Sequence, residues 1–257
     1  MAPSAKTGFD ASELWNTTGL TEHLGGSAAS RHLIAASGFR EDCHVLDAGC
    51  GSGYTACLLA TEAGSRVTAL DVRKGVLAKA AERITRLRSR VPIHLVGGDI
   101  QALPFADDAF DGVMCESVLA FCDQPLALAE LCRVLRPGGV LGSNEMTYLR
   151  PPSRSWEERF STGWMGVNLR PRQEGEWRAL FEQAGLTVES AEVSPISLKA
   201  QAASHMEVDG MWRYWTVAMR YLVRPAIWRT FFSPSMWPLW REYPTVVGCG
   251  LYVLRKL

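Results

Sequence analysis

Short apolar runs alternate with longer amphipathic stretches along the first half of the chain, which is typical of a sheet covered by helices. Five apolar runs predict buried strands, at residues 44–48, 66–70, 93–96, 110–115 and 139–144. Three amphipathic stretches predict helices, at residues 54–63, 74–89 and 124–135. Strands and helices of this length in alternation imply an α/β domain with helices on both faces of a parallel sheet.

The alternation breaks twice in the second half of the chain. Residues 149–174 contain prolines, two tryptophans and several arginines, which predict a loop that acts as a lid. A helix at 174–184 and a strand at 186–193 follow, and a last strand is predicted at 246–254. Between these two strands lies an insert, residues 196–244, that carries five of the nine tryptophans.

These elements predict a single domain built from three parts. We expect an N-terminal helical segment at 1–40, a core formed by 41–195 and 245–257, and an aromatic, helical insert at 196–244. With 257 residues and 47% hydrophobic content, the chain can bury one core of ordinary size.

Charge and cysteine content exclude several classes of protein. Lysine and arginine (27) balance aspartate and glutamate (27), so no global field attracts nucleic acid. Seven irregularly spaced cysteines without a CxxC pair predict neither a disulfide framework nor a metal site. Cys115, Cys122 and Cys132 raise the alternative of metalloid binding by soft thiolates, but core packing is the favoured interpretation. Because no apolar run suits a signal peptide or a spanning helix, we expect a cytoplasmic protein.

A glycine-rich turn, DAGCGSG at residues 47–53, follows the first predicted strand. Gly49, Gly51 and Gly53 stand at alternate positions, which lets the backbone turn tightly and approach a ligand closely. Asp47, two residues before the first glycine, suits a zwitterion with an ammonium group better than a dinucleotide pyrophosphate. The turn therefore favours the methionine end of S-adenosylmethionine, with an NAD-dependent oxidoreductase as the alternative.

Two further carboxylates follow predicted strands. Asp71 ends the second strand, where α/β folds commonly bind ribose hydroxyls, a feature that NAD enzymes share. Asp99 and Ile100 follow the third strand and offer a carboxylate and an apolar side chain to an adenine amino group and ring.

Four segments resemble, in order and in spacing, the class I methyltransferases of the methyltransferase type 11 family. They are VLDAGCGSG (45–53), VTALD (67–71), GDIQALPFADDAFDGVMCESVL (98–119) and LRPGGVLG (135–142). The resemblance extends over about residues 40–148 and includes the last strand. It implies a Rossmann-like sheet of seven strands whose last strand is antiparallel, with S-adenosyl-L-methionine as the cofactor.

The resemblance also implies a set of cofactor-binding residues: Asp47, Gly49, Cys50, Gly51, Gly53, Asp71, Val72, Asp99, Ile100 and Glu116. Those in the turn would line the methionine end, Asp71 would accept the ribose hydroxyls, and Val72 would lie against the adenine. Asp99 and Ile100 would bind the adenine edge. Glu116, or the serine after it, would face the cofactor from the fourth strand.

The flanks resemble a narrower branch of small-molecule methyltransferases. LTEHLGG (20–26) resembles a segment that this branch folds over the cofactor. NEMTY (144–148) is similar to the end of the fifth strand in that branch. Methyl transfer from a sulfonium is an in-line displacement, which needs a general base only when the acceptor arrives protonated. His23 and Glu145 are the candidates for that base, and a local structural hydrogen bond is the alternative for each.

The sequence thus predicts a methyltransferase that acts on a small-molecule acceptor. A non-catalytic protein that binds the cofactor is one alternative. Another is a methyltransferase at a membrane surface that acts on a lipid-like or quinone-type acceptor, through peripheral contact by residues 205–241.

The insert supports both a lid and a membrane contact. Apolar residues recur with helical spacing at 208, 211, 212, 215, 219 and 222. Pro225 should end that helix, and Arg213, Arg220 and Arg224 lie elsewhere around it. A lid over the acceptor is favoured. A basic, tryptophan-rich element on a membrane is the second interpretation, and an oligomer contact is the third.

If the insert is a lid, S-adenosylhomocysteine should change its tryptophan fluorescence and protect it from proteolysis, because ligand binding would bury its apolar side chains. Fluorescence titration and limited proteolysis measure these effects. Salt-sensitive binding to anionic liposomes would contradict the lid if this binding disappears when 205–241 is replaced by a short linker and cofactor affinity and turnover stay intact.

Overall fold

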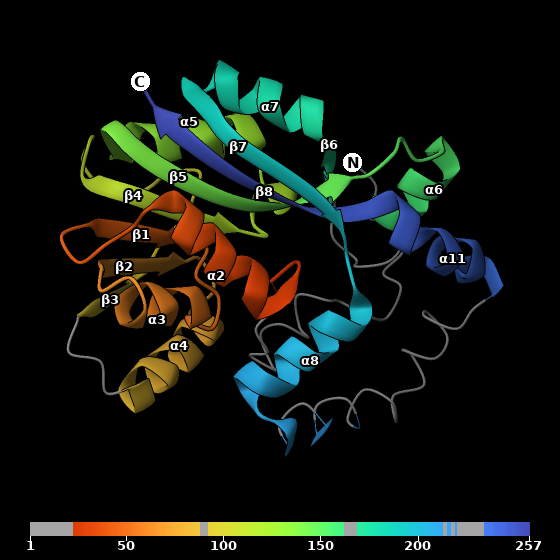
Figure 1. Ribbon diagram of the computed structural model, residues 1–257, viewed down its shortest axis with the longest axis horizontal. Coiled ribbons are helices and arrows are strands. Elements are labelled where there is room, and N and C mark those ends of the chain that lie inside the picture. The colour runs from red at the N-terminus through yellow and green to blue at the C-terminus, as the bar shows by residue number, and fades with distance from the viewer. Residues whose placement is uncertain (1–22, 88–91, 162–168, 213–214, 217–218, 220–233) are drawn as a thin grey trace.

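The computed structural model describes residues 23–87, 92–161, 169–212, 215–216, 219 and 234–257, and its centre is one mixed sheet (Figure 1). Seven strands pair in the order β3-β2-β1-β4-β5-β8-β7. They are β1 (His44–Ala48), β2 (Arg66–Asp71), β3 (Ile93–Gly97), β4 (Phe110–Glu116), β5 (Leu135–Tyr148), β7 (Leu186–Pro195) and β8 (Val247–Lys256). A two-residue strand, β6 (Arg172–Gln173), pairs with the end of β5.

The direction of the strands confirms the predicted sheet. Strands β1 to β5 pair with one another in parallel. Strand β8 runs antiparallel to both β5 and β7. The chain therefore has the Rossmann-like sheet with an antiparallel last strand, and β6 adds a short eighth strand.

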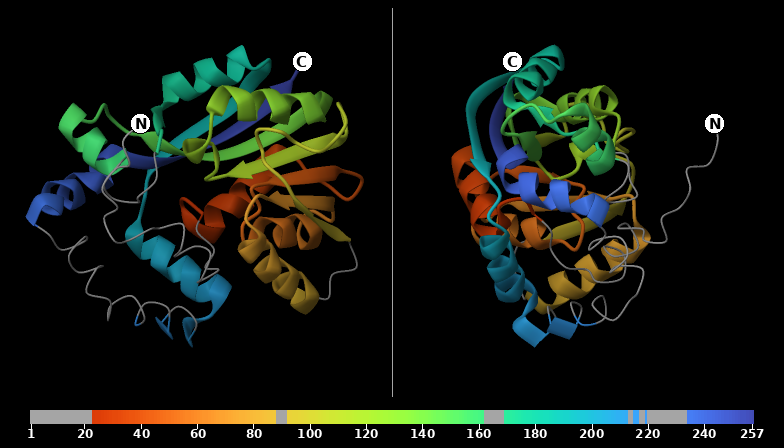
Figure 2. Two further views of the ribbon diagram at one scale, coloured as in Figure 1. Left: turned by 180° about the vertical axis from the view of Figure 1, so that it is seen from behind. Right: turned by 90° about the vertical axis from the view of Figure 1, so that its right-hand side faces the viewer.

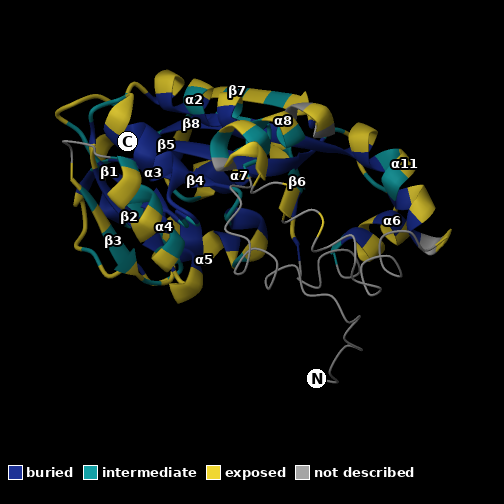
Figure 3. Cartoon of the chain, turned by 90° about the horizontal axis from the view of Figure 1, so that it is seen from below, coloured by how far each residue is buried: buried dark blue, intermediate teal, exposed yellow. Residues whose placement is uncertain are grey.

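Helices cover both faces of the sheet (Figures 1 and 2). One face packs against α2 (Gly26–Ser37), α3 (Tyr54–Thr61) and α4 (Lys74–Leu87), and the other against α5 (Gln124–Val134) and α7 (Glu174–Gln183). Adjacent strand residues supply the two faces, because successive side chains point to opposite sides of a strand. Seen from below, the central strands are mostly buried, whereas the edge strands β3 and β7 and the outer faces of the helices are largely intermediate or exposed (Figure 3).

Local chemistry sets where the helices of the second face begin. Asp123 caps α5 by accepting a hydrogen bond from the amide of Leu126. A capping box starts α7, where the Glu176 carboxylate accepts from the amide of Gln173. Trp177 of α7 is fully buried and its indole N–H donates to the carbonyl of Met146, so its one polar atom is satisfied.

A third apolar cluster lies at the end of the molecule away from β3. It joins α6 (Arg154–Arg159) with α11 (Trp237–Val246), which follows the short 3-10 turn η3 (Pro234–Met236) (Figure 2). Another helix of the insert, α8 (Leu198–Asp209), contacts α2 instead. Within the described ranges, none of the helices combines the length and apolar character needed to cross a bilayer.

One sequence prediction about an irregular region was wrong. Residues 149–174 were predicted as a loop, but Ser153 caps helix α6 and β6 joins the sheet, while 162–168 lie outside the described residues. Of the residues predicted to be helical from 208 onward, Val208 lies in α8, which ends before Gly210 (φ 86°), and the described residues 211–212, 215–216 and 219 are helical. The predicted N-terminal helical residues before 23 also lie outside the described part of the chain.

Truncating a buried side chain of α5 should destabilise the fold. Leu128 is fully buried in the core, so Leu128→Ala should lower the free energy of unfolding by about 2–5 kcal/mol. Leu126→Ala is the matched control on the same helix, because Leu126 is 57% exposed, and we expect a change of at most about 0.5 kcal/mol. Denaturant unfolding followed by circular dichroism measures both. Equal losses in the two variants would contradict this account of the core.

Candidate functional site

Most of the predicted site residues gather at the carboxyl ends of the parallel strands. β1 lies between β2 and β4 in the sheet. The strand order therefore reverses at β1: β2 and β3 follow on one side of it, and β4 and β5 on the other. Ligands of open α/β sheets bind at such a switch point. The glycine-rich turn, residues 47–53, leads from β1 into α3 at this place.

Backbone hydrogen bonds hold the glycine-rich turn against the end of β2. The amides of Gly49 and Cys50 donate to the carbonyl of Leu70 over 2.7 and 2.8 Å. The amide of Gly51 donates to Oδ2 of Asp71 over 3.0 Å. Two carboxyl-end features predicted separately, the turn and Asp71, are therefore in direct contact.

Only glycine fits at the centre of this turn. Gly49 has a φ of 81°, and a Cβ there would lie 2.4 Å from Val118. Gly51 has a φ of 52°, but a Cβ on it would meet no heavy atom within 4 Å. The backbone at Gly51 is therefore open on one side, which leaves room for a ligand at the turn.

Asp47 is a buried carboxylate with one free oxygen. It is 2% exposed, and its Oδ2 has no hydrogen-bond partner among the described residues. Burial raises the pKa of Asp47 well above its ordinary value, and the negative charges of Glu116 and Asp71 add to this effect. A cationic group at Oδ2 would satisfy the oxygen and offset that cost, so the site fits an ammonium group.

Asp71 already has partners in this structure. Besides Gly51, it accepts hydrogen bonds from the amide of Arg73 over 2.8 Å and from the guanidinium of Arg73 over 3.2 Å. Val72, between them, is 66% exposed. Ribose hydroxyls at Asp71 would therefore share the carboxylate with Arg73 or displace its side chain.

The residues predicted for the adenine edge divide between the surface and the core. Asp99 is exposed and accepts hydrogen bonds from the amide and the side chain of Gln101. Ile100 is 7% exposed and packs in the core cluster beneath α5. The structure thus places Asp99 in a local turn and leaves Ile100 little surface for a ligand.

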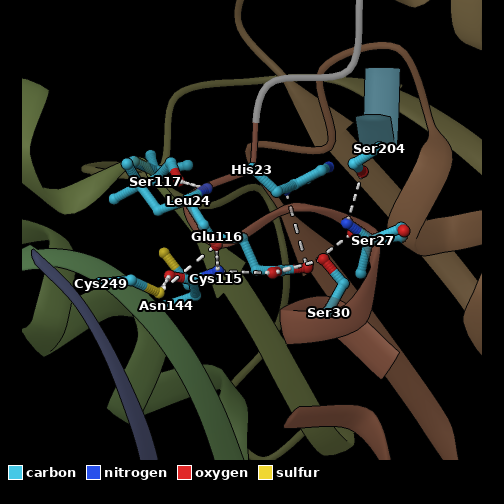
Figure 4. Close-up of polar contacts among 12 residues, drawn as sticks. His23, Leu24, Ser27, Ser30, Cys115, Glu116, Ser117, Asn144, Ser204 and Cys249 are labelled. Carbon is cyan, nitrogen blue, oxygen red and sulfur yellow. Dashed lines mark hydrogen bonds and ion pairs between the residues drawn. The ribbon is translucent and has the colours of Figure 1, made fainter. Parts of the chain in front are cut away.

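Glu116 ends β4 as the centre of a polar network (Figure 4). It accepts hydrogen bonds from Ser30 of α2 over 2.8 Å, Thr55 of α3 over 2.7 Å and Asn144 of β5 over 3.1 Å. Nδ1 of His23 lies 3.8 Å from its Oε1. The carboxylate therefore joins four segments that are far apart in the sequence.

Sequence reasoning missed the three donors around Glu116. Ser30 and Thr55 carry no signal of their own, because nothing in the sequence distinguishes these hydroxyls from those of Ser27, Ser37 and Tyr54, which are also buried on the same two helices. Asn144 offered a signal, since a fully buried amide near the end of a core strand must find partners. The predicted Glu145 lies beside it in the chain.

His23 lies next to the glycine-rich turn. Its ring centroid is 5.9 Å from that of Tyr54, the first residue of α3. Gly25 and Gly26, with φ values of 77° and 72°, turn the chain from His23 into α2. This part of the predicted segment 20–26 therefore lies over the carboxyl end of the sheet, and 20–22 fall outside the described residues.

Glu145, the second predicted base, is enclosed by the protein. It is fully buried, and its Oε1 accepts hydrogen bonds from the amides of Leu119 over 3.1 Å and Val118 over 3.4 Å. Burial raises the pKa of Glu145 to about 8. The carboxylate of Glu145 therefore points toward the turn after β4, which contains the 3-10 helix η1 (Leu119–Phe121). A catalytic role of Glu145 stays a prediction.

The insert contacts the site region through α8. The amide of Ser27 in α2 donates to Oγ of Ser204 over 2.7 Å, and the Ser27 hydroxyl donates to Glu207 over 3.4 Å. Two of its tryptophans point outward, since Trp212 is 85% exposed and Trp237 is 72% exposed. The insert is therefore tied beside the site while these two indole rings remain at the surface.

Comparison with known proteins agrees with this geometry. Residues 46–142 match the methyltransferase domain family. The malonyl-[acyl-carrier protein] O-methyltransferase of Pseudescherichia vulneris is 31% identical over 183 residues, which cover 68% of this chain and 70% of that protein. An uncharacterized protein of Haemophilus influenzae is 30% identical over 164 residues; the match covers 63% of this chain and 65% of that protein's length.

A solved structure shows the same fold. The S-adenosylmethionine-dependent methyltransferase from Thiobacillus denitrificans, in complex with S-adenosyl-L-homocysteine, superposes with a TM-score of 0.70. The match covers 97% of this chain and all of that one, at 18% identity. At this identity the likeness concerns the fold.

The raised pKa of Glu145 makes stability depend on pH. Its folded-state pKa, about 8, lies above the unfolded value of about 4.5, so its contribution is fully present below pH 4.5 and is lost toward pH 8. Glu145→Gln keeps an oxygen for the two amides but cannot ionise. We therefore expect the variant to gain stability relative to the wild type as the pH rises from 5 to 8.

Urea unfolding at several pH values measures this difference. Glu41→Gln, a matched change at an exposed carboxylate, gives the background. A constant difference between the Glu145 variant and the wild type across this range would mean that the carboxyl does not titrate there.

Proposed function

The chain belongs to the class I S-adenosylmethionine-dependent methyltransferases, and we propose that it methylates a small-molecule acceptor at the carboxyl ends of β1, β4 and β5. Family membership decides for S-adenosylmethionine over a nicotinamide cofactor, which the sequence had left as an alternative. The unpaired Oδ2 of Asp47, buried beside an open glycine turn, is the observation that supports this site for the cofactor.

The residues of the turn fit the methionine end of the cofactor. Asp47 Oδ2 would accept a hydrogen bond from its ammonium group, which removes both the unpaired oxygen and the repulsion from neighbouring carboxylates. Gly51, where a Cβ would meet no heavy atom within 4 Å, leaves this approach free of side chains. Gly49 and Gly53, on either side of Cys50 and Gly51, let the turn pack closely against Val118 and Ala80.

The remaining cofactor residues would hold the nucleoside end. Asp71 would accept the ribose hydroxyls at the end of β2, where its carboxylate is in contact with Gly51 and Arg73. Val72 offers an exposed apolar surface for the adenine ring, and Asp99 a carboxylate for the amino group. Ile100 would contribute through the small part of its side chain outside the core.

Bound S-adenosylmethionine supplies a methyl group on a positively charged sulfur, which leaves as a neutral thioether. The protein's own contribution is to hold the two partners in line and to exclude water. Asp47 and the turn fix one partner, while the segment around His23 and helix α8, joined by Ser27 and Ser204, would enclose the other.

The acceptor class is a proposal drawn from relatives and from the insert. The Pseudescherichia vulneris relative is named as acting on malonyl-[acyl-carrier protein], so acyl thioesters are the first acceptors to test. The apolar, aromatic insert beside α2 favours a small acceptor with an apolar portion.

A second candidate is methyl transfer at a membrane surface to a lipid-like acceptor. One observation favours it: large apolar side chains of the insert are more than half exposed, namely Met211, Trp212, Met219 and Trp237. Large exposed apolar side chains are typical of a surface that contacts another molecule when they gather into one patch.

Calorimetric titration with S-adenosylhomocysteine tests the cofactor site. Asp71→Ala should weaken binding by about 1.5–3 kcal/mol, the range for hydrogen bonds to a charged group. Asp42→Ala, at an exposed carboxylate away from the glycine turn, should bind like the wild type. Unchanged affinity in the Asp71 variant would remove that residue from the site.

A screen with cofactor labelled in its methyl group tests turnover. Purified protein should transfer label to a compound in a metabolite extract or to a defined acyl thioester. Tight cofactor binding without transfer to any acceptor would argue against the proposed reaction.

A further inference from the structure

A buried carboxylate faces one nitrogen of the His23 ring. Nδ1 lies 3.8 Å from Oε1 of Glu116, is buried, and has no hydrogen-bond partner among the described residues. The whole side chain keeps 13% exposure. Nδ1 therefore faces the carboxylate, and Nε2 lies at the opposite edge of the ring (Figure 4).

Neutral groups hold the Glu116 carboxylate in place. The hydroxyl of Thr55 donates to Oε1, and the hydroxyl of Ser30 and the amide of Asn144 donate to Oε2. The side chain of Glu116 is 2% exposed, and no lysine or arginine of the described ranges pairs with it. Because neutral donors orient a carboxylate without neutralising it, His23 is the described group beside it that can take up a positive charge.

Asn144 sets the distance between the carboxylate and the histidine. Its Nδ2 donates both to Glu116 and, over 2.9 Å, to the carbonyl of Leu24. The same carbonyl also accepts from the thiol of Cys249, and the amide of Leu24 donates to Ser117. The backbone next to His23 and the carboxylate are thus fixed to the same side chain (Figure 4).

The pair lies where the methyl group would be presented. His23 contacts the ring of Tyr54, which directly follows the glycine turn proposed for the methionine end of the cofactor. The reactive sulfonium belongs to that end.

We propose that His23 and Glu116 form a proton-accepting pair for the methyl acceptor, an inference that rests on the proposed function. The negative charge of Glu116, 3.8 Å from Nδ1, favours the proton on that nitrogen, so that Nε2 of His23, the catalytic base, presents a lone pair. Glu116 and Asn144 are positioning residues. In the transfer, the acceptor atom gives its proton to Nε2, its electron pair forms the bond to the methyl carbon, and the carbon–sulfur bond breaks with its pair on sulfur. Nε2 then releases the proton to water.

The pair also indicates the class of acceptor. A free carboxylate at neutral pH has already lost its proton and needs no base, whereas a hydroxyl, a thiol or an ammonium group does. We therefore expect methylation of a protonated oxygen, sulfur or nitrogen.

The tautomer of His23 tests the geometry. In 15N-labelled protein with S-adenosylhomocysteine bound, nitrogen NMR should show Nδ1 protonated and Nε2 bare, with His23 assigned by its loss in His23→Gln. Glu116→Gln should shift the proton toward Nε2. The chain offers a matched control, because Glu192 lies 3.1 Å from His32 at the surface, and Glu192→Gln should leave the His23 signals unchanged. An Nε2–H tautomer in the wild type would overturn the proposal.

Turnover tests the chemistry. The probes are small phenols, alcohols, thiols and amines, with malonyl-CoA as the carboxylate acceptor. On a protonated probe, His23→Gln and Glu116→Gln should each lower kcat on the order of 100-fold, while the KM of His23→Gln for S-adenosylmethionine stays within about twofold. Glu192→Gln should have wild-type kcat.

The outcomes separate this inference from the proposed function. Wild-type kcat in His23→Gln, or turnover confined to malonyl-CoA, would overturn the pair while the methyltransferase remains. A wild-type protein that does not bind S-adenosylhomocysteine contradicts the proposed cofactor site instead. If cofactor binds and no probe turns over, the tautomer measurement decides for or against the pair.

Discussion

The cost of burying carboxylates shapes the carboxyl end of this sheet. Asp47, Asp71, Glu116 and Glu145 lie at or near the ends of β1, β2, β4 and β5, and each is at most 6% exposed. An ionised carboxylate that is removed from water is strongly disfavoured unless it gains hydrogen bonds or a partner charge. The protein compensates each of these side chains differently, and the differences indicate what each side chain does.

Two of the carboxylates have hydrogen-bond partners for both oxygens within the described chain: Asp71 has Gly51 and the guanidinium of Arg73, and Glu116 has neutral donors. Glu145 has backbone amides at Oε1 only, its Oε2 is buried without a partner among the described residues, and its pKa is raised. Asp47 keeps one oxygen without a partner, and the charges of its neighbours make that state less favourable still. A cationic ligand would relieve this imbalance, so the local electrostatics favour occupancy by a group such as an ammonium.

The same network connects the site to distant parts of the chain. Asn144 on β5 holds Leu24 of the N-terminal segment, and Cys249 on β8 reaches the same carbonyl. Ser204 of the insert accepts a hydrogen bond from the amide of Ser27, three residues after Leu24 in the chain. The position of His23 therefore depends on four segments at once, which is why a change in the insert could alter the site without touching the cofactor.

The sequence by itself determined the sheet and the turn, and it favoured the cofactor class that the family comparison then decided. Apolar runs and their spacing follow from local periodicity, and a glycine turn such as 47–53 follows from backbone sterics, so both can be read one segment at a time. Only the tertiary structure decided how Glu116 is used. Its partners Ser30, Thr55 and Asn144 lie 28 to 86 positions away, and their roles depend on the closure of several segments around one buried charge. The direction of Glu145 toward the turn after β4 was decided in the same way, because burial and hydrogen bonding exist only once the strands have packed.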